Sequence, residues 1–252
     1  MAPVAAGHGA DLDTTGSERC VDITSEQFER GTFLSRLSAD DLTALAGVAR
    51  RRMYPRGATL LAAESRSDWV LFLLRGRVKV SHHTADGRAL LLAVLGPGEP
   101  LGEQSAIEDV PVHATATALD QVEVMLVSAR AFREWIGDRH GASLALLECW
   151  SKRLRKADGE RIEFVMNDTM GRVAGRLVEL TERYGVATNG HVRIALPLSQ
   201  EELGSWAGSS REATSRALQS LRRHQLIQTR RKEIMILDPE AMRDRADARN
   251  AR

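Results

Sequence analysis

Residues 198–223 read LSQEELGSWAGSSREATSRALQSLRR and predict two short helices joined by a tight turn. Ser199 and Glu202 have the spacing of a capping box, which satisfies backbone N–H groups at the start of a helix. Gly208 stands where the chain has to bend, because glycine adopts left-handed conformations without a Cβ clash. This stretch therefore predicts a helix-turn-helix unit.

The second helix of this unit is expected to begin at Ser209 or Ser210, with Glu212 completing a Ser-x-x-Glu box with Ser209. Its apolar residues recur at helical spacing and would face inward. The residues left facing out are Arg211, Glu212, Ser215, Arg216 and Gln219.

The outward face suits DNA. The second helix of a helix-turn-helix enters the major groove, where Arg matches guanine O6 and N7 and Glu accepts from cytosine N4. Arg211 and Glu212 are consecutive and Arg216 lies about one turn further, so one half-site is within reach of all three. The alternative is a capped surface helix with charges in water. DNA is favoured because residues 209–232 hold seven basic residues against one acidic residue.

SSREATSRAL following LSQEELGSWAG resembles the recognition motif of the cyclic-AMP receptor protein and fumarate–nitrate reduction regulator (Crp/Fnr) superfamily. The resemblance extends over roughly residues 32 to 240. It implies a bacterial transcription regulator whose Arg211, Glu212 and Arg216 read a TGTGA-like half-site. The implied fold is α+β, with a cyclic-nucleotide-binding-like β-roll, a long dimerisation helix and a winged helix-turn-helix. The expected boundaries are residues 32–138, 139–167 and 168–240, respectively.

Composition agrees with a two-domain globular protein: the chain has 252 residues, 43% of them hydrophobic and 27% charged. The net charge of +1 alone does not suggest nucleic acid. The charge is uneven, however, with 15 basic against 19 acidic residues in 1–140 and 20 against 15 in 141–252. Positive charge gathered in one half is typical of DNA binding.

Several classes of protein are disfavoured by composition. Cys20 and Cys149 are too few for a disulfide framework or a four-cysteine iron–sulfur cluster. The N-terminus lacks Lys and Arg before Arg19, unlike a signal peptide, and no apolar run approaches the ~18 residues of a membrane span. We therefore expect a cytoplasmic protein, with a disordered tail at residues 1–31 and a frayed charged tail at residues 241–252.

From residue 51 to about 127 the sequence predicts short strands punctuated by glycine, as in a small β-roll. Asp86-Gly87 is a strong signal for a hairpin turn. The resemblance implies that Gly102 and Glu103 begin a short helix that holds a cyclic phosphate and a ribose hydroxyl, with Gln104 beside them. His82 and His83 are interpreted as strand-end residues rather than metal ligands.

Cyclic AMP is not the expected effector. About ten residues after the Gly-Glu pair, nucleotide-binding members carry an Arg, but this chain has Val112-His113 and no Lys or Arg from residue 89 to 121. Losing that charge-assisted hydrogen bond costs roughly 1.5–3 kcal/mol. The alternative is a nucleotide bound through Gly102, Glu103 and a protonated His113, which would make binding pH-dependent.

Residues 130–167 predict helix with an interruption near Gly137 and Gly141, followed by a seam of apolar residues about every 3.5 positions. The seam includes Leu144, Leu147, Leu154 and Val165. The resemblance implies that this helix forms a homodimer and that Ala157 and Asp158 occupy positions that otherwise meet adenine. These residues again disfavour cyclic AMP. The alternative is that the seam packs on its own β-roll, and Gly159 is a weak point for flexing.

Asp168 is expected to cap a helix, and residues 226–237 predict a wing hairpin that meets phosphates. The candidate backbone-binding residues are Ser199, Gln200, Ser210, Thr214, Arg230, Arg231 and Lys232.

Together these features predict a dimeric DNA-binding regulator without enzymatic activity, partnered by double-stranded DNA and potentially by RNA polymerase and a small-molecule effector. One rival is a nucleotide-binding module serving an enzyme or channel, but the chain shows neither a catalytic domain nor a membrane span. The other is a metal-dependent cupin, and its paired His and Glu ligands are missing from the predicted strands.

Overall fold

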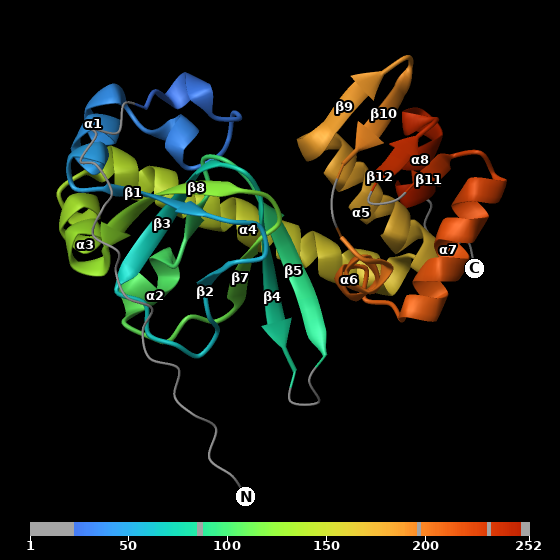
Figure 1. The fold of residues 1–252 in the computed structure, drawn as a ribbon, viewed down its shortest axis with the longest axis horizontal. Coiled ribbons are helices and arrows are strands. Elements are labelled where there is room, and N and C mark those ends of the chain that lie inside the picture. Colours follow the sequence, from blue (N-terminus) through green and yellow to red (C-terminus); the bar gives the residue numbers. More distant parts are fainter. Residues whose placement is uncertain (1–22, 85–87, 196–197, 231–232, 248–252) are drawn as a thin grey trace, which may run out of the picture.

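The computed structural model describes residues 23–84, 88–195, 198–230 and 233–247. One long helix, α4 (His140–Met166), joins an N-terminal lobe to a C-terminal lobe (Figure 1). Each lobe combines helices with antiparallel sheet, which confirms the predicted α+β class. None of the helices in the described ranges combines the length and the apolar composition needed to span a bilayer.

The N-terminal lobe is a β-roll made of two antiparallel sheets. In the described residues, one sheet has the strand order β1-β8-β3-β6 and the other β2-β7-β4-β5. The strands are β1 (Arg50–Tyr54), β2 (Thr59–Leu61), β3 (Trp69–Arg75), β4 (Val78–His83), β5 (Ala89–Leu95), β6 (Pro100–Leu101), β7 (Thr115–Ala118) and β8 (Val122–Ser128). β4 and β5 form the predicted hairpin, whose Asp86-Gly87 turn lies outside the described residues.

Helices cover the ends of the roll. They are η1 (Ser25–Gln27), η2 (Leu34–Arg36), α1 (Ala39–Gly47), α2 (Glu103–Glu108) and α3 (Ala129–Gly137). Aromatic side chains from several of these elements meet in one core, where the Phe33 and Phe72 rings stack 5.7 Å apart. Phe28 belongs to the same core and is 7% exposed. Residues 23–31 therefore differ from the expected disordered tail, because Phe28 anchors them; residues 1–22 are outside the described ranges.

Helix α4 has two unlike faces. Ala142, Ala145, Leu146 and Cys149 are buried and pack against the N-terminal lobe. The predicted seam lies on the other face, where Leu144, Leu147, Leu154 and Val165 are 47%, 58%, 64% and 76% exposed. The seam thus does not pack on its own β-roll, and large apolar side chains remain open to solvent.

The C-terminal lobe surrounds helix α5 (Thr169–Tyr184), which Asp168 caps as predicted by accepting from the Gly171 amide at 2.7 Å. Its sheet has the order β11-β12-β10-β9. The remaining elements are β9 (Gly185–Thr188), β10 (His191–Ile194), α6 (Gln200–Trp206), α7 (Arg211–Arg223), β11 (Ile227–Arg230), β12 (Glu233–Ile236) and α8 (Pro239–Asp247). Apolar faces of α5, α6 and α7 share one core with the sheet.

Helix α8 occupies a segment that the sequence assigned largely to a frayed tail. Its Met242 is 1% exposed and packs against α5, and its Arg245 bonds both carboxylate oxygens of Asp168 at 2.7 Å. Asn167 donates from Nδ2 to the Ala246 carbonyl at 2.8 Å. Helix α8 therefore closes over the junction between α4 and α5.

The two lobes also touch through the β4–β5 hairpin. The Leu91 amide donates to Ser205 Oγ at 3.0 Å, and Lys79 on β4 pairs with Glu202 on α6. Leu91 and Val94 are buried in the core of the C-terminal lobe rather than in that of the roll. Strand β5 is thus shared by both lobes.

Arg245→Met is expected to destabilise the C-terminal lobe by about 1 kcal/mol, the scale of a partly exposed ion pair. Burial raises the pKa of Asp168, but hydrogen bonds from Arg245 and the Gly171 amide outweigh it and hold the pKa below its ordinary 3.8. This stabilisation is complete above pH 3.8 and is lost as pH falls through the lowered native value. Urea unfolding of wild type and variant, from neutral pH to about pH 2, measures it.

Arg243→Met is the matched control, since Arg243 lies on the same helix and contacts Glu182 at 3.5 Å rather than the junction. Identical pH profiles for wild type and Arg245→Met would contradict the assignment.

Candidate nucleic-acid interface and effector cavity

Helix α6 begins with the predicted capping box. Ser199 Oγ accepts from the Glu202 amide at 3.1 Å, and Glu202 Oε2 accepts from the Ser199 amide at 2.7 Å. Both contacts satisfy N–H groups that the helix itself leaves free. Ser199 and Gln200 are exposed at this end.

The turn between α6 and α7 is held from two directions. Gly208 has a φ of 59°, and a Cβ there would lie 2.9 Å from the Phe164 ring at the end of α4. Arg172 on α5 donates from Nε to the Ala207 carbonyl at 2.8 Å and from Nη2 to the Gly208 carbonyl at 3.3 Å. The turn is therefore tied to both long helices.

The cap of α7 is Ser210, whose Oγ accepts from the Ala213 amide at 3.2 Å. The expected Ser209–Glu212 box is wrong, because Ser209 instead donates to the Ser210 carbonyl at 3.4 Å. Hydrogen bonds from its own backbone amide and from the Ser210 hydroxyl hold the pKa of Glu212 below its ordinary value. Glu212 therefore stays ionised near neutral pH.

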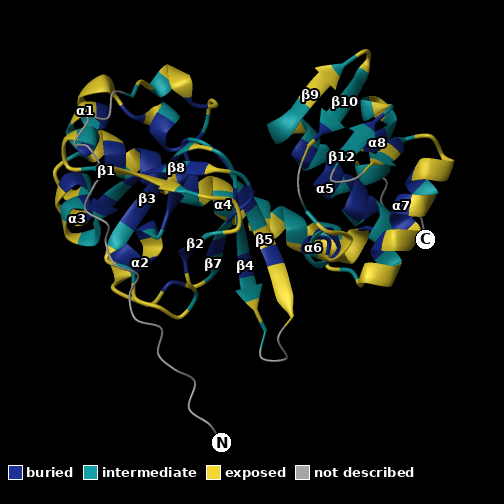
Figure 2. Ribbon diagram, viewed as in Figure 1, coloured by how far each residue is buried: buried dark blue, intermediate teal, exposed yellow. Residues whose placement is uncertain are grey.

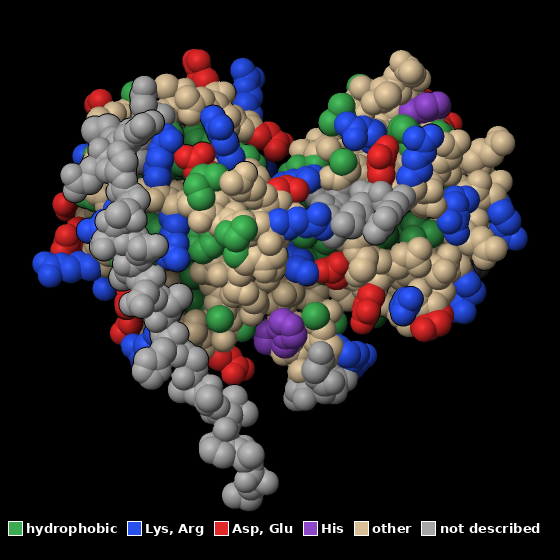
Figure 3. All heavy atoms as spheres, viewed as in Figure 1, with side chains coloured by type: hydrophobic (Ala, Val, Ile, Leu, Met, Phe, Trp, Pro, Cys, Tyr) green, Lys and Arg blue, Asp and Glu red, His purple; other side chains and the backbone are tan. Residues whose placement is uncertain are grey.

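Helix α7 has exposed residues along one side of its length (Figure 2). Arg211, Glu212, Arg216 and their neighbours Ser215 and Gln219 are exposed, and Ala217, Leu218 and Leu221 are buried beneath them. Lys and Arg side chains lie along the edge of the lobe formed by α7 (Figure 3). The structure thus brings the three candidate base-reading residues onto one open face.

Thr214 is placed differently from the expected phosphate-binding role. It is fully buried, donates to the Ser210 carbonyl at 2.9 Å, and packs where a Cβ on Gly204 would lie 2.5 Å from its hydroxyl. Thr214 therefore fixes the crossing of α6 and α7 and does not face solvent. Arg230 is exposed at the end of β11, while Arg231 and Lys232 lie outside the described residues.

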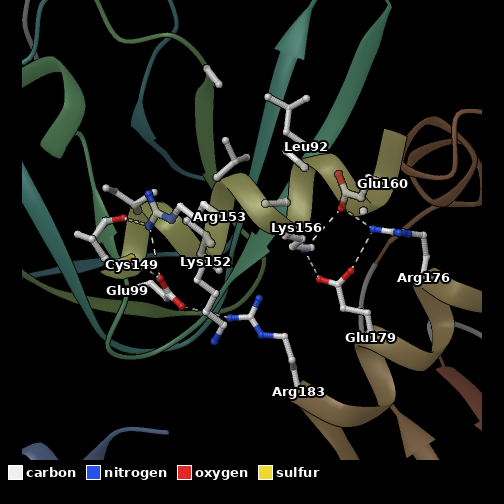
Figure 4. Close-up of a pocket in the computed structure, with 18 of the residues that line it drawn as sticks. Leu92, Glu99, Cys149, Lys152, Arg153, Lys156, Glu160, Arg176, Glu179 and Arg183 are labelled. Carbon is white, nitrogen blue, oxygen red and sulfur yellow. Dashed lines mark hydrogen bonds and ion pairs between the residues drawn. The ribbon is translucent and has the colours of Figure 1, made fainter. Parts of the chain in front are cut away.

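A cavity of about 950 Å³ runs along α4, between the β-roll on one side and α5 on the other (Figure 4). Gly102, Glu103, Gln104 and His113 line it, as expected. Asp158 does not, because it lies on the exposed face of α4 and contacts Arg161 at 3.6 Å.

Glu103 is only 2% exposed and is already engaged. Its Oε1 accepts from Arg153 at 2.6 Å and from the Trp150 indole at 3.2 Å. Arg153 also contacts Glu99 at 3.4 Å and the Pro100 carbonyl at 3.1 Å. Burial alone would lower the pKa of the Arg153 guanidinium, but the charges around it, chiefly Glu103, raise it above its usual value, so that it stays protonated.

His113, the alternative phosphate-binding residue, lines the cavity. Its ring stacks on His82 with centroids 5.3 Å apart, and its carbonyl lies 3.3 Å from His82 Nδ1. Among the described residues that line the cavity, the Lys and Arg side chains all come from α4 and α5. The β-roll wall thus contributes no Lys or Arg to this part of the cavity as described.

An ion cluster that the sequence did not reveal joins the helices α4 and α5 around a buried Arg. Arg176 on α5 is 5% exposed and contacts Glu160 at 2.5 Å, Glu179 at 3.1 Å and Glu163. Lys156 on α4 pairs with Glu179 in the same cluster (Figure 4). The available signal was a lone Arg on the apolar face of α5, beside Val173 and Leu177.

Both cations of this cluster also lie over the Trp206 ring of α6, Lys156 at 5.5 Å and Arg176 at 5.6 Å from its centroid. Such cation–π contacts add to the ion pairs. Side chains at the cavity wall are therefore in direct contact with the first helix of the helix-turn-helix.

No group of three or more His, Cys, Asp or Glu side chains suited to a metal occurs in the part of the chain that the structure describes. Cys149 is buried, and burial raises the pKa of its thiol to about 11. Cys20 lies outside the described residues.

Family models match both lobes. A Crp-like helix-turn-helix domain matches residues 171–245, and a cyclic nucleotide-binding domain matches residues 51–139.

The chain is 33% identical to a "CRP-like cAMP-activated global transcriptional regulator" of Mycobacterium tuberculosis, over 77% of this chain and 86% of that protein. Among solved structures, FixK2 of Bradyrhizobium japonicum matches with a TM-score of 0.69 and 24% identity, over 80% of this chain and 98% of that one. The c-di-GMP responsive regulator CLP of Xanthomonas campestris matches with a TM-score of 0.69 and 21% identity, over 80% of this chain and 100% of that one. The last two likenesses concern the fold.

Proposed function

Because the chain belongs to the Crp/Fnr superfamily of transcription regulators, which are not enzymes, we propose that it binds a palindromic DNA site as a homodimer. The observation that carries this proposal is the open row of Arg211, Glu212 and Arg216 on a capped helix inside the matched helix-turn-helix domain. Double-stranded DNA is the proposed partner, and a cytoplasmic location follows from that role.

In this proposal Arg211 and Arg216 read guanines and Glu212 reads cytosine within a TGTGA-like half-site. Ser199, Gln200, Ser210 and the wing residues Arg230, Arg231 and Lys232 hold the phosphate backbone. Thr214 is left out of this set because it is buried.

Dimerisation is proposed through α4, whose exposed apolar seam has the spacing of a two-stranded coiled coil. A two-fold dimer presents its recognition helices about one helical turn of DNA apart and thus favours an inverted repeat. The proposed division is a sensor lobe at residues 32–138, a dimerisation helix at 139–167 and a DNA-binding domain from residue 168. RNA polymerase is a natural partner of a dimer so placed.

We further propose that the β-roll has lost the phosphate contacts of cyclic AMP, since the described β-roll wall of the cavity bears no Lys or Arg. The alternative, favoured by the presence of Gly102, Glu103 and His113 at the cavity, is a regulator that still binds a cyclic nucleotide. The name of the Mycobacterium tuberculosis relative, which describes it as cAMP-activated, also supports this alternative.

A labelled duplex with TGTGA and its inverted repeat tests the function by fluorescence anisotropy, with and without cyclic AMP. We expect specific binding without the nucleotide, at least about 1000-fold tighter than to a scrambled duplex. Binding only with cyclic AMP would establish the alternative. Equal affinity for both duplexes would reject the half-site.

Arg211→Ala is expected to cost about 1–3 kcal/mol of DNA affinity and to relax specificity at one base pair. The reason is the loss of a bidentate contact to guanine. Anisotropy with duplexes substituted at each position measures it, and Arg130→Ala, on an exposed Arg of α3, is the control. A uniform loss across all sequences would make Arg211 a phosphate contact instead.

Leu154→Glu is expected to convert the dimer to a monomer and to weaken binding to the palindrome about 100-fold, because one half-site is then bound at a time. Analytical ultracentrifugation and anisotropy measure the two effects. Met53→Glu, a matched exposed apolar position on β1, should leave the dimer intact. A dimeric Leu154→Glu protein would place the interface elsewhere.

A further inference from the structure

The cavity along α4 has walls and charges of its own, which specify a class of ligand. We propose that it binds an uncharged, largely apolar small molecule, and that this molecule modulates DNA binding. The second half of this inference rests on the proposed function as a DNA-binding regulator.

The β-roll side of the cavity is apolar. Leu61, Val80, Leu101, Val112 and Ala116 all line it, and most of them are buried. A volume of about 950 Å³ lies within the roughly 300–1,000 Å³ of small-molecule sites. Burying an apolar body against such walls is favourable because it removes apolar surface from water.

The charges of the cavity disfavour an anion. Among the described residues that line it, eight carry carboxylates and five carry ammonium or guanidinium groups. Four of the five cations are already bonded: Arg153 to Glu103, Arg183 to Glu99 at 3.5 Å, and Lys156 and Arg176 to Glu179. Lys152, the fifth, is exposed. Away from the exposed Lys152, an anion entering here would meet surplus carboxylate or would have to break an ion pair.

An organic cation is disfavoured by a different feature. Two carboxylates that line the cavity, Glu99 and Glu103, are 7% and 2% exposed and are both bonded to Arg153. A cation that took either carboxylate would have to replace Arg153, which would lose one of its two ion pairs. Gln104 and His113 line the same region and supply amide and imidazole groups. These groups suit hydroxyl or carbonyl groups on a neutral ligand.

Strand β5 connects this cavity to the DNA-binding lobe. Leu92, Ala93 and Leu95 line the cavity, whereas Leu91 and Val94 are buried against the C-terminal lobe. The Leu91 amide also bonds Ser205 on α6. A ligand that fills the cavity therefore contacts a strand whose other residues pack against the helix-turn-helix. Such a ligand binds to some orientations of the C-terminal lobe more tightly than to others, and so shifts their populations.

Decanol, decanoate and decylamine, which share one chain and differ in charge at neutral pH, test the ligand class. Each is titrated against the full chain loaded with the uncharged dye Nile red, and displacement is followed by fluorescence. We expect decanol to displace the dye at about tenfold lower concentration than either ion, a preference of roughly 1.4 kcal/mol. Equal or stronger displacement by decanoate or decylamine would overturn the proposal.

Two cavity-filling variants locate the site. Ala116→Trp should abolish the dye binding for which decanol competes. If the tryptophan prevents folding, the smaller change Ala116→Leu serves instead and should weaken this binding. Val186→Trp, at an exposed position of β9, is the matched control and should bind as wild type does. Unchanged binding in a folded Ala116 variant would place the dye elsewhere and overturn the assignment.

His113→Arg supplies the missing cation and should reverse the preference, so that decanoate displaces the dye better than decanol; no reversal would count against the charge argument.

The palindrome duplex separates the two proposals. Decanol binding that leaves specific DNA affinity unchanged overturns the modulation. Specific DNA binding without decanol binding overturns the ligand class alone. Decanol binding without specific DNA binding overturns the proposed function.

Discussion

The contact between the two lobes depends on the interactions that the Arg176 guanidinium makes. The guanidinium is almost fully buried and is bonded by carboxylates from α4 and from its own helix, while its face lies against Trp206 of α6. A buried charge tolerates no loss of a partner, because the remaining desolvation penalty is several kcal/mol. The exposed apolar seam of α4, the cavity wall and the helix-turn-helix are thus linked through one side chain and its glutamates.

The second constraint is the hydrophobic core that crosses the boundary between the lobes. Leu91, Val94 and Leu119 belong by sequence to the β-roll, yet they are buried with α5, α6 and α7. Arg183 and Tyr184 at the end of α5 reinforce this contact by donating to the Val94 carbonyl at 3.1 and 3.2 Å. The C-terminal lobe consequently packs on the β-roll, and the orientation of α7 depends on both lobes.

Much of this structure was predictable, because strong local signals coincide with it. The Ser199–Glu202 box, the glycine turn and the outward face of α7 follow from capping chemistry and helical periodicity. Neighbouring serines compete for one cap, so the choice of Ser210 over Ser209 required tertiary packing. Helix α8 was missed because Met242 is almost alone among charged residues, and its stability comes from α5 and Asp168. Arg176 was missed and Thr214 was misjudged for the same reason: a polar side chain that the fold buries cannot be told from an exposed one by its sequence alone.

Strand β5 has a consequence for how such a protein changes over generations. Its residues are divided between two sites, with Leu92 and Leu95 at the cavity and Leu91 and Val94 against the C-terminal lobe, across an irregularity in the pairing of β5 with β4. Because a strand moves as one body, a substitution that reshapes the pocket is transmitted to the surface that seats the helix-turn-helix. Under the proposed function, a change of ligand and the retention of a DNA site are therefore genetically linked. A substitution in β5 is expected to affect both the cavity and the packing of the helix-turn-helix. Substitutions that compensate for it are expected in α6 rather than in the roll.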